Sequence, residues 1–251
     1  MIHFVGAGPG AVDLITVRGE RLLRRAGMVI YAGSLVNPAL LSLVPAGCEV
    51  HDSSGMTLEQ VLERLMDGAS RHETVVRLHT GDPSLFGAIR EQMDALDANG
   101  FAHEVVPGVS SFLAAAAALE AEYTLPGVSQ TVILSRMAGR TPVPEREEIA
   151  RLAAHGATMV LFLSSGMLGS LSERLMAGGC TADTPAAIVY KASWPDERKI
   201  VGTVGALEAM GRAIDVKATA LVLVGRFLGD AYDRSLLYDP GFGHGLREAA
   251  R

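Results

Sequence analysis

Short apolar runs alternate with amphipathic segments along the whole chain. The first run, Ile2–Val5, is almost entirely apolar, and the segment after it places Val17, Leu22 and Leu23 on one side of a helix with charged residues between them. Near-continuous apolar runs are typical of strands buried on both faces, and a 3.6-residue apolar period is typical of helices that pack on a sheet. The alternation therefore predicts an α/β fold.

The first half of the chain contains five predicted strands, which are Ile2–Val5, Met28–Tyr31, Cys48–His51, Thr74–His79 and His103–Val106. A helix is predicted over 57–66, with Thr57 as N-cap and Gln60 at the capping-box position. Three of the strands end in glycine-containing loops that open a helix, namely Gly6–Ala11, Thr80–Gly87 and Pro107–Ser111. Ligands bind at the carboxyl ends of parallel strands, so we expect these loops to share one edge of the sheet.

The alternation of predicted strands and helices is interrupted at Glu120–Ser129. We place a domain boundary there, which gives domains 1–119 and 120–251. The second half has predicted strands at Thr131–Ser135, Thr158–Leu163, Ala186–Tyr190, Arg198–Val204 and Ala218–Val224, and helices at Glu145–Ala154, Leu168–Met176 and Leu207–Ile214. Arg198–Val204 alternates in polarity, unlike the buried runs. We expect two α/β/α domains, with a parallel-rich N-terminal sheet and a mixed C-terminal sheet.

Composition narrows the possible partners. The 251 residues carry a formal charge of −6, so no basic surplus supports binding to nucleic acid. The longest apolar runs are far shorter than the ~20 residues of a membrane span. The two cysteines, Cys48 and Cys180, form no metal-binding or redox motif, and we expect a reduced, cytoplasmic protein without membrane partners.

The run Gly6-Ala7-Gly8-Pro9-Gly10-Ala11 fits a loose dinucleotide-binding pattern. A site for NAD or FAD also needs an acidic residue at the end of the second strand, to hold the ribose hydroxyls. Tyr31 is followed instead by Ala32 and Gly33, and this absence argues against a dinucleotide.

Candidate chemistry gathers at the predicted sheet edge. None of the seven histidines has a close metal-ligand spacing, and no metal is expected. His79 stands beside Thr80, Gly81 and Asp82 at the end of a strand. Asp82 has two interpretations, a helix N-cap before Pro83 or a carboxylate that faces a ligand.

Three arginines are candidates for binding anions. Arg77 lies inside an otherwise apolar strand, and Arg136 and Arg140 flank a loop that ends in two prolines. Arginine binds carboxylates through two parallel hydrogen bonds, although a solvated loop is the plain alternative for Arg136 and Arg140.

Three motifs carry a resemblance to a known family. The run Gly6–Gly10 with Asp13–Thr16, the run Gly81–Pro83 with Phe86-Gly87, and Pro107–Ser111 resemble, in order and spacing, the signatures of the tetrapyrrole methylases. The segments Tyr31–Val36 and Arg136–Pro144 are similar to the branch that methylates C11 of precorrin-4 or cobalt-precorrin-4.

The resemblance implies a homodimer of two-domain subunits, with S-adenosylmethionine bound in a folded conformation in a cleft between the domains and an anionic tetrapyrrole as substrate. By motif position it implies cofactor contacts from Pro9, Thr80, Gly81, Asp82, Leu85, Ser110, Ser111, Leu163, Ala192 and Ala220. Substrate contacts are expected from Gly8, Arg77, Arg136 and Arg140, and His79 and Asp82 are the candidate catalytic residues.

Methyl transfer to carbon needs aligned reactants rather than a covalent nucleophile or a metal. The motifs leave open whether the substrate contains cobalt. Three other interpretations stay open at this point: methylation of another tetrapyrrole position, a nucleotide-dependent dehydrogenase, and a non-catalytic regulatory module.

Overall fold

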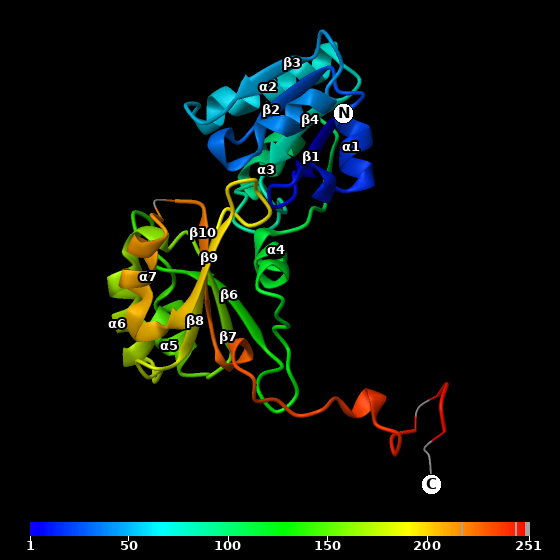
Figure 1. The fold of residues 1–251 in the computed structure, drawn as a ribbon. Coiled ribbons are helices and arrows are strands. Elements are labelled where there is room, and N and C mark those ends of the chain that lie inside the picture. The colour runs from blue at the N-terminus through cyan, green and yellow to red at the C-terminus, as the bar shows by residue number, and fades with distance from the viewer. Residues whose placement is uncertain (217, 244, 249–251) are drawn as a thin grey trace. The chain divides into compact units, whose positions relative to one another are not determined.

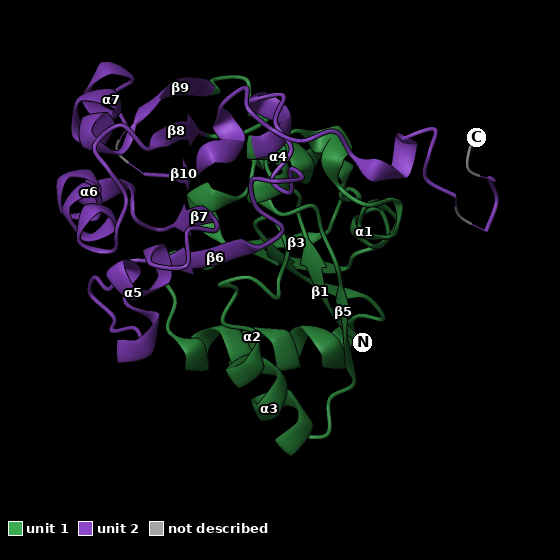
Figure 2. Cartoon of the chain, turned by 90° about the horizontal axis from the view of Figure 1, so that it is seen from below, with its two compact units in different colours: residues 1–115, 191–197 green, residues 116–190, 198–251 purple. Residues whose placement is uncertain are grey.

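The computed structural model describes residues 1–216, 218–243 and 245–248. By its internal packing the chain divides into two compact units. Unit 1 comprises Met1–Ala115 and Lys191–Glu197, and unit 2 comprises Ala116–Tyr190 and Arg198–Arg251 (Figure 2). This grouping differs from the predicted domain bounds in residues 116–119 and 191–197, so the chain passes from one unit to the other more than once.

Unit 1 is built on a five-stranded parallel sheet with strand order β3-β2-β4-β1-β5 (Figure 1). The strands are β1 (Ile2–Gly6), β2 (Met28–Tyr31), β3 (Glu49–Asp52), β4 (Val75–His79) and β5 (His103–Val106). Each lies within two residues of its predicted bounds. For β1, β2 and β4 the match follows from burial on both faces, which demands the continuous apolar runs seen in the sequence, whereas the edge strands β3 and β5 are partly exposed.

Helices cover both faces of this sheet. On one face Val5 and Leu78 pack with Leu23 of α1 (Val17–Leu23). On the other, Phe4 packs with Leu65 and Leu96. The helices on this second face are α2 (Leu58–Arg71) and α3 (Arg90–Ala98), and α4 (Ser111–Ala118) follows β5 in the chain.

The capping box predicted for α2 is confirmed. The Thr57 hydroxyl accepts a hydrogen bond from the Gln60 N–H at 3.4 Å, and the Gln60 side-chain oxygen accepts one from the Thr57 N–H at 2.9 Å. The helix continues to Arg71, beyond the predicted end at residue 66, and Gly68 is buried in this added turn.

Unit 2 has a mixed sheet with strand order β6-β7-β10-β8-β9, in which only the β6–β7 pair is parallel. The strands are β6 (Val132–Arg136), β7 (Thr158–Phe162), β8 (Pro185–Tyr190), β9 (Arg198–Thr203) and β10 (Ala220–Val224). Three helices, α5 (Ile149–Ala153), α6 (Leu168–Ala177) and α7 (Leu207–Ala213), contribute to one apolar core with the sheet. The predicted fold class, with its parallel and mixed sheets, is confirmed.

The helix predicted over Glu145–Ala154 is shorter than expected. Residues Glu145–Glu147 form a single 3-10 turn, Glu148 is extended, and its carboxylate accepts a hydrogen bond from the Ala150 N–H at 2.8 Å to cap α5. An acidic side chain used as a cap thus divides what the apolar period alone predicts as one helix. Among the described residues, no helix combines the length and the apolar character that crossing a membrane requires.

Candidate active site

Three loops of unit 1 meet at the carboxyl ends of β1, β4 and β5, as the motifs predict. We name Gly6–Ala11 the glycine-rich loop, 80–89 the second loop and 107–110 the third loop. Gly8 and Gly81 exchange backbone hydrogen bonds of 3.2 and 2.8 Å, which join the first two loops. The Gly108 N–H donates to Asp82 Oδ2 at 2.8 Å and joins the third loop to the second.

The close approach of the loops explains two glycines. A Cβ atom on Gly6 would lie 2.5 Å from the Gly108 Cα and 2.6 Å from the Gly81 carbonyl oxygen. Gly8 has a φ of 78°, in the left-handed region that other residues rarely adopt. These glycines therefore allow the loops to pack closely.

The N–H groups of the glycine-rich loop are almost all used inside the protein. The N–H of Ala7 donates to the His79 carbonyl at 2.7 Å, that of Gly8 donates to Gly81, and that of Ala11 donates to Ser193 Oγ at 3.0 Å. Pro9 has no N–H. Within residues 7–11, Gly10 alone has an N–H without a partner in the described part of the chain. A diphosphate needs several free N–H groups, so this geometry argues against the dinucleotide interpretation.

Asp82 is held in place by three hydrogen bonds and does not cap a helix. Its Oδ1 accepts from the Ser84 N–H at 2.8 Å and from the Ser84 hydroxyl, in addition to the Gly108 bond at Oδ2. Partial burial raises the pKa of this carboxyl, but the hydrogen bonds from Ser84 and Gly108 outweigh it, and the pKa is lowered overall. The predicted N-cap role is wrong, because α3 begins only at Arg90.

The delayed start of α3 has a local cause. Phe86 and Ala88 have φ values of 58° and 49°, which no right-handed helix contains. A Cβ on Gly87 between them would lie 2.1 Å from the Pro83 carbonyl oxygen. The second loop is therefore a tightly folded, irregular segment rather than the first turn of a helix.

Arg77 and His79 lie side by side on β4, both buried. Arg77 Nη1 donates to Ser53 Oγ at 3.0 Å and to the Ile30 carbonyl at 3.3 Å, and burial lowers the pKa of its guanidinium to about 10. With 7% of its surface exposed, Arg77 is poorly placed as a clamp for a substrate, and its contacts favour a structural role.

His79 is only 4% exposed, and its Nε2 has no hydrogen-bond partner in the described residues. Burial, helped by the positive charge of Arg77, lowers the pKa of this imidazole to about 3. The side chain is therefore neutral at physiological pH.

The other candidate residues are divided between the units. Unit 1 holds Pro9, Thr80, Leu85, Ser110, Ser111 and Ala192, and unit 2 holds Leu163, Ala220, Arg136 and Arg140. Arg136 donates to the carbonyls of Met137, Thr141 and Pro142 at 3.1, 3.2 and 2.8 Å, and so braces its own loop. Arg140 is exposed.

Strained backbone marks several of these positions. Non-glycine residues with positive φ include Phe86 beside Leu85, Leu163 itself, Lys191 and Ser193 on either side of Ala192, and Thr219 before Ala220. Such conformations cost free energy and persist where surrounding structure holds them, often at binding sites. The strain is independent of the sequence motifs and supports the same positions.

The motifs give no sign of a fourth loop at this edge. Residues 191–197, which we name the tryptophan loop, connect β8 to β9 and pack in unit 1. Trp194 Nε1 donates to the Pro9 carbonyl at 2.9 Å. Asn37 Nδ2 adds a hydrogen bond of 2.8 Å to the Gly10 carbonyl. The one signal in the sequence is that Trp194 is the single tryptophan of a chain poor in aromatic residues.

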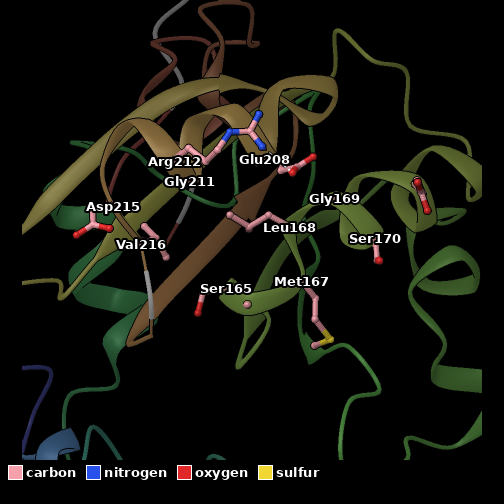
Figure 3. Close-up of a pocket in the computed structure, with 12 residues that line it drawn as sticks. Ser165, Met167, Leu168, Gly169, Ser170, Glu208, Gly211, Arg212, Asp215 and Val216 are labelled. Carbon is pink, nitrogen blue, oxygen red and sulfur yellow. Dashed lines mark hydrogen bonds and ion pairs between the residues drawn. The ribbon is translucent and has the colours of Figure 1, made fainter.

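A separate pocket of about 630 Å³ lies within unit 2, between the start of α6 and helix α7 (Figure 3). Its lining includes Ser165, Met167 and the Arg212–Glu208 ion pair, in which Nη1 and Oε1 are 2.6 Å apart. None of the candidate residues lines this pocket. In the described ranges, no three His, Cys, Asp or Glu side chains are arranged to hold a metal ion.

Comparison with known proteins agrees with the loop motifs. A family model described as "Tetrapyrrole (Corrin/Porphyrin) Methylases" matches residues 1–208. The cobalt-precorrin-4 C(11)-methyltransferase of Methanocaldococcus jannaschii is 45% identical over 249 residues, which cover 99% of this chain and 96% of the relative. The precorrin-4 C(11)-methyltransferase of Mycobacterium tuberculosis is 45% identical, with 94% of this chain and 95% of the relative covered.

Solved structures give the same result for the fold. A cobalt-precorrin-4 methyltransferase structure has a TM-score of 0.88 and 45% identity, with 91% of this chain and 96% of that chain covered. A uroporphyrin-III C-methyltransferase from Thermus thermophilus, in complex with S-adenosylhomocysteine, has a TM-score of 0.76 and 29% identity, with 90% and 92% covered.

Proposed function

Because the chain belongs to the tetrapyrrole methylase family, we propose that it is an S-adenosylmethionine-dependent methyltransferase of cobalamin biosynthesis. It methylates precorrin-4 or cobalt-precorrin-4 at C11. The observation that carries this proposal is the identity of 45%, along nearly the whole chain, to enzymes with that activity in their names.

The residues of the site fit such a cofactor. S-adenosylmethionine supplies an activated methyl group on a positively charged sulfonium and contains no phosphate. The glycine-rich loop, whose N–H groups at Ala7, Gly8 and Ala11 are already paired, suits a ligand without phosphate. Within unit 1, the cofactor is held by a set of loop residues: Pro9, Thr80, Gly81, Asp82, Leu85, Ser110, Ser111 and Ala192.

Catalysis by this chain rests mainly on positioning. The hydrogen bonds of Asp82 hold the second and third loops in register, so that both reactants meet a preorganised surface. An imidazole with a pKa of about 3 is a weak base at neutral pH, so His79 acts as a neutral hydrogen-bonding group rather than as a general base. Exposed Arg140 binds the anionic substrate, whereas the N–H and the carbonyl of Gly8 are already bonded to Gly81.

A labelling experiment tests the activity. The protein is incubated with methyl-labelled S-adenosylmethionine and, in separate reactions, with precorrin-4, cobalt-precorrin-4 and uroporphyrinogen III, and the label is located by NMR. Label at C11 of a precorrin-4 form supports the proposal and identifies the metal state of the substrate. Label only on uroporphyrinogen III contradicts it and supports another activity of the same family.

Calorimetry separates the proposal from the other classes of function. We expect S-adenosylhomocysteine to bind and NAD to give no heat of binding. The reverse result would establish a nucleotide-binding protein. Binding of S-adenosylhomocysteine without turnover of any of the three substrates would support a regulatory module.

A further inference from the structure

The tryptophan loop reaches the glycine-rich loop from a distant part of the chain. The Trp194 Nε1–H donates to the Pro9 carbonyl at 2.9 Å, and Ser193 Oγ accepts from the Ala11 N–H at 3.0 Å. These two bonds lie on either side of Gly10, so the tryptophan loop fixes the backbone of the glycine-rich loop both before and after this residue.

The packing at Gly10 is complementary to the indole ring. A Cβ on Gly10 would lie 2.0 Å from Trp194 Cδ1 and 2.4 Å from Nε1, well inside the closest approach of non-bonded atoms. The φ of Gly10 lies outside the left-handed region, so its backbone conformation does not require glycine. Glycine is needed at position 10 because the indole occupies the space of a side chain.

The tryptophan loop is itself held rigidly. The Lys191 ammonium lies 5.1 Å from the centre of the indole ring and 2.7 Å from Asp196 Oδ2. The Ser193 N–H donates to Glu197 Oε2 at 2.6 Å, although Ser193 has a φ of 66°. A loop that keeps this strained conformation through several bonds can act as a template for the loop that it contacts.

We propose that Trp194 is a positioning residue that sets the conformation of the glycine-rich loop for ligand binding. Its hydrogen bond takes up the carbonyl of Pro9, and its ring fills the space above Gly10. Pro9 and Gly8 are then presented to cofactor and substrate in one conformation. This inference rests on the proposed function, because the ligands in question are S-adenosylmethionine and the tetrapyrrole.

A cycle of four variants tests the contact, with affinity for S-adenosylhomocysteine measured by calorimetry. Trp194→Phe keeps an aromatic ring at this position and loses the N–H donor, and we expect binding of S-adenosylhomocysteine to weaken about five-fold, the effect of one hydrogen bond. Gly10→Ala forces the ring aside, and we expect a loss of about tenfold or more. When Trp194 is already replaced by Ala, the same Gly10→Ala change should weaken the affinity for S-adenosylhomocysteine by less than about two-fold.

Gly55→Ala is the matched control. Gly55 is a glycine of unit 1 with open space where a Cβ would stand and no left-handed φ, so its replacement should leave the affinity unchanged. Equal losses from Gly10→Ala in both backgrounds, or wild-type affinity in both Trp194 variants, would overturn the proposal.

Fluorescence gives a second measurement, which should not respond to the ligand if the role of Trp194 is merely structural. Trp194 is the single tryptophan, so the emission of the wild-type protein reports on this loop alone. We expect S-adenosylhomocysteine to change that emission with the same dissociation constant as calorimetry. Unchanged emission at saturation would contradict the proposal.

The proposed function and this inference can fail separately. If the wild-type protein does not bind S-adenosylhomocysteine, the proposed function fails. The cycle is then measured as the midpoint of urea unfolding, where strong coupling between Gly10→Ala and Trp194→Ala still supports the positioning contact and additivity overturns it.

Discussion

His79 shows how burial changes the chemistry of a single residue. Its place at the end of β4 suggests a catalytic histidine, but its ring is buried and Arg77 adds positive charge nearby. Both effects favour the neutral form, so the residue that looks like a proton carrier in the sequence is a poor base in the fold. The Nε2 atom has no hydrogen-bond partner among the described residues, so it keeps its capacity to form a hydrogen bond.

Acid should destabilise the protein through His79. Its pKa is 6.5 when unperturbed and about 3 in the folded state, so between these values the unfolded chain binds a proton that the folded chain does not. The contribution of His79 to the free energy of unfolding is fully present above pH 6.5 and is lost as the pH falls toward 3. The free energy then falls by up to about 1.4 kcal/mol per pH unit.

The measurement is urea unfolding of the wild type and His79→Gln from pH 7.5 to pH 4. We expect the free energy of unfolding of His79→Gln to fall less steeply below pH 6.5 than that of the wild type. Parallel curves for the two proteins would show that His79 does not titrate in this way.

At the scale of elements, loops rather than helices or strands carry the candidate site. Hydrogen bonds join the three loops of the sheet edge, and the tryptophan loop adds two more at Pro9 and Ala11. In unit 2, the loop after β6 uses Arg136 to hold its own carbonyls, which leaves Arg140 exposed on a braced segment. One arginine therefore shapes the loop, and the other is free to contact an anionic substrate.

Replacing these two arginines should have different effects. Arg140→Ala should raise the substrate KM about tenfold, because it removes one charged hydrogen bond to a carboxylate, and should leave the thermal unfolding midpoint unchanged. Arg136→Ala should lower the unfolding midpoint, because three carbonyls lose their donor. An unchanged KM in Arg140→Ala, measured by steady-state kinetics, would remove Arg140 from the substrate site.

At the scale of the whole molecule, the chain is shared between two units in an order that is not sequential. The tryptophan loop belongs to unit 1, although β8 and β9 on either side of it belong to unit 2. The conformation of the glycine-rich loop therefore depends on a part of unit 1 that lies more than 180 positions away in the sequence. The family resemblance also implies a homodimer, which we propose for this protein.

Sedimentation equilibrium tests the oligomeric state. We expect twice the chain mass of 26.4 kDa at micromolar concentration, with and without S-adenosylhomocysteine. A mass of one chain under both conditions would contradict the proposed homodimer.

The sequence by itself determined the elements and the edge at which the loops meet. Apolar runs buried on both faces predict strands such as β1 and β4, and parallel strands bring their carboxyl ends to one edge whatever the details of packing. The capping box at Thr57 could likewise be predicted from the sequence, since its two residues are three positions apart. Local patterns of this kind need no knowledge of the tertiary structure.

Only the tertiary structure decided what the loop residues do. The bond between Trp194 and Pro9 joins residues 185 positions apart, and Asp82 bonds to Gly108 across 26. The burial that makes His79 neutral comes from helices and strands packed around β4. Such effects depend on which distant groups meet in space, and hydrophobic periodicity records only that a residue is buried, not which residue covers it.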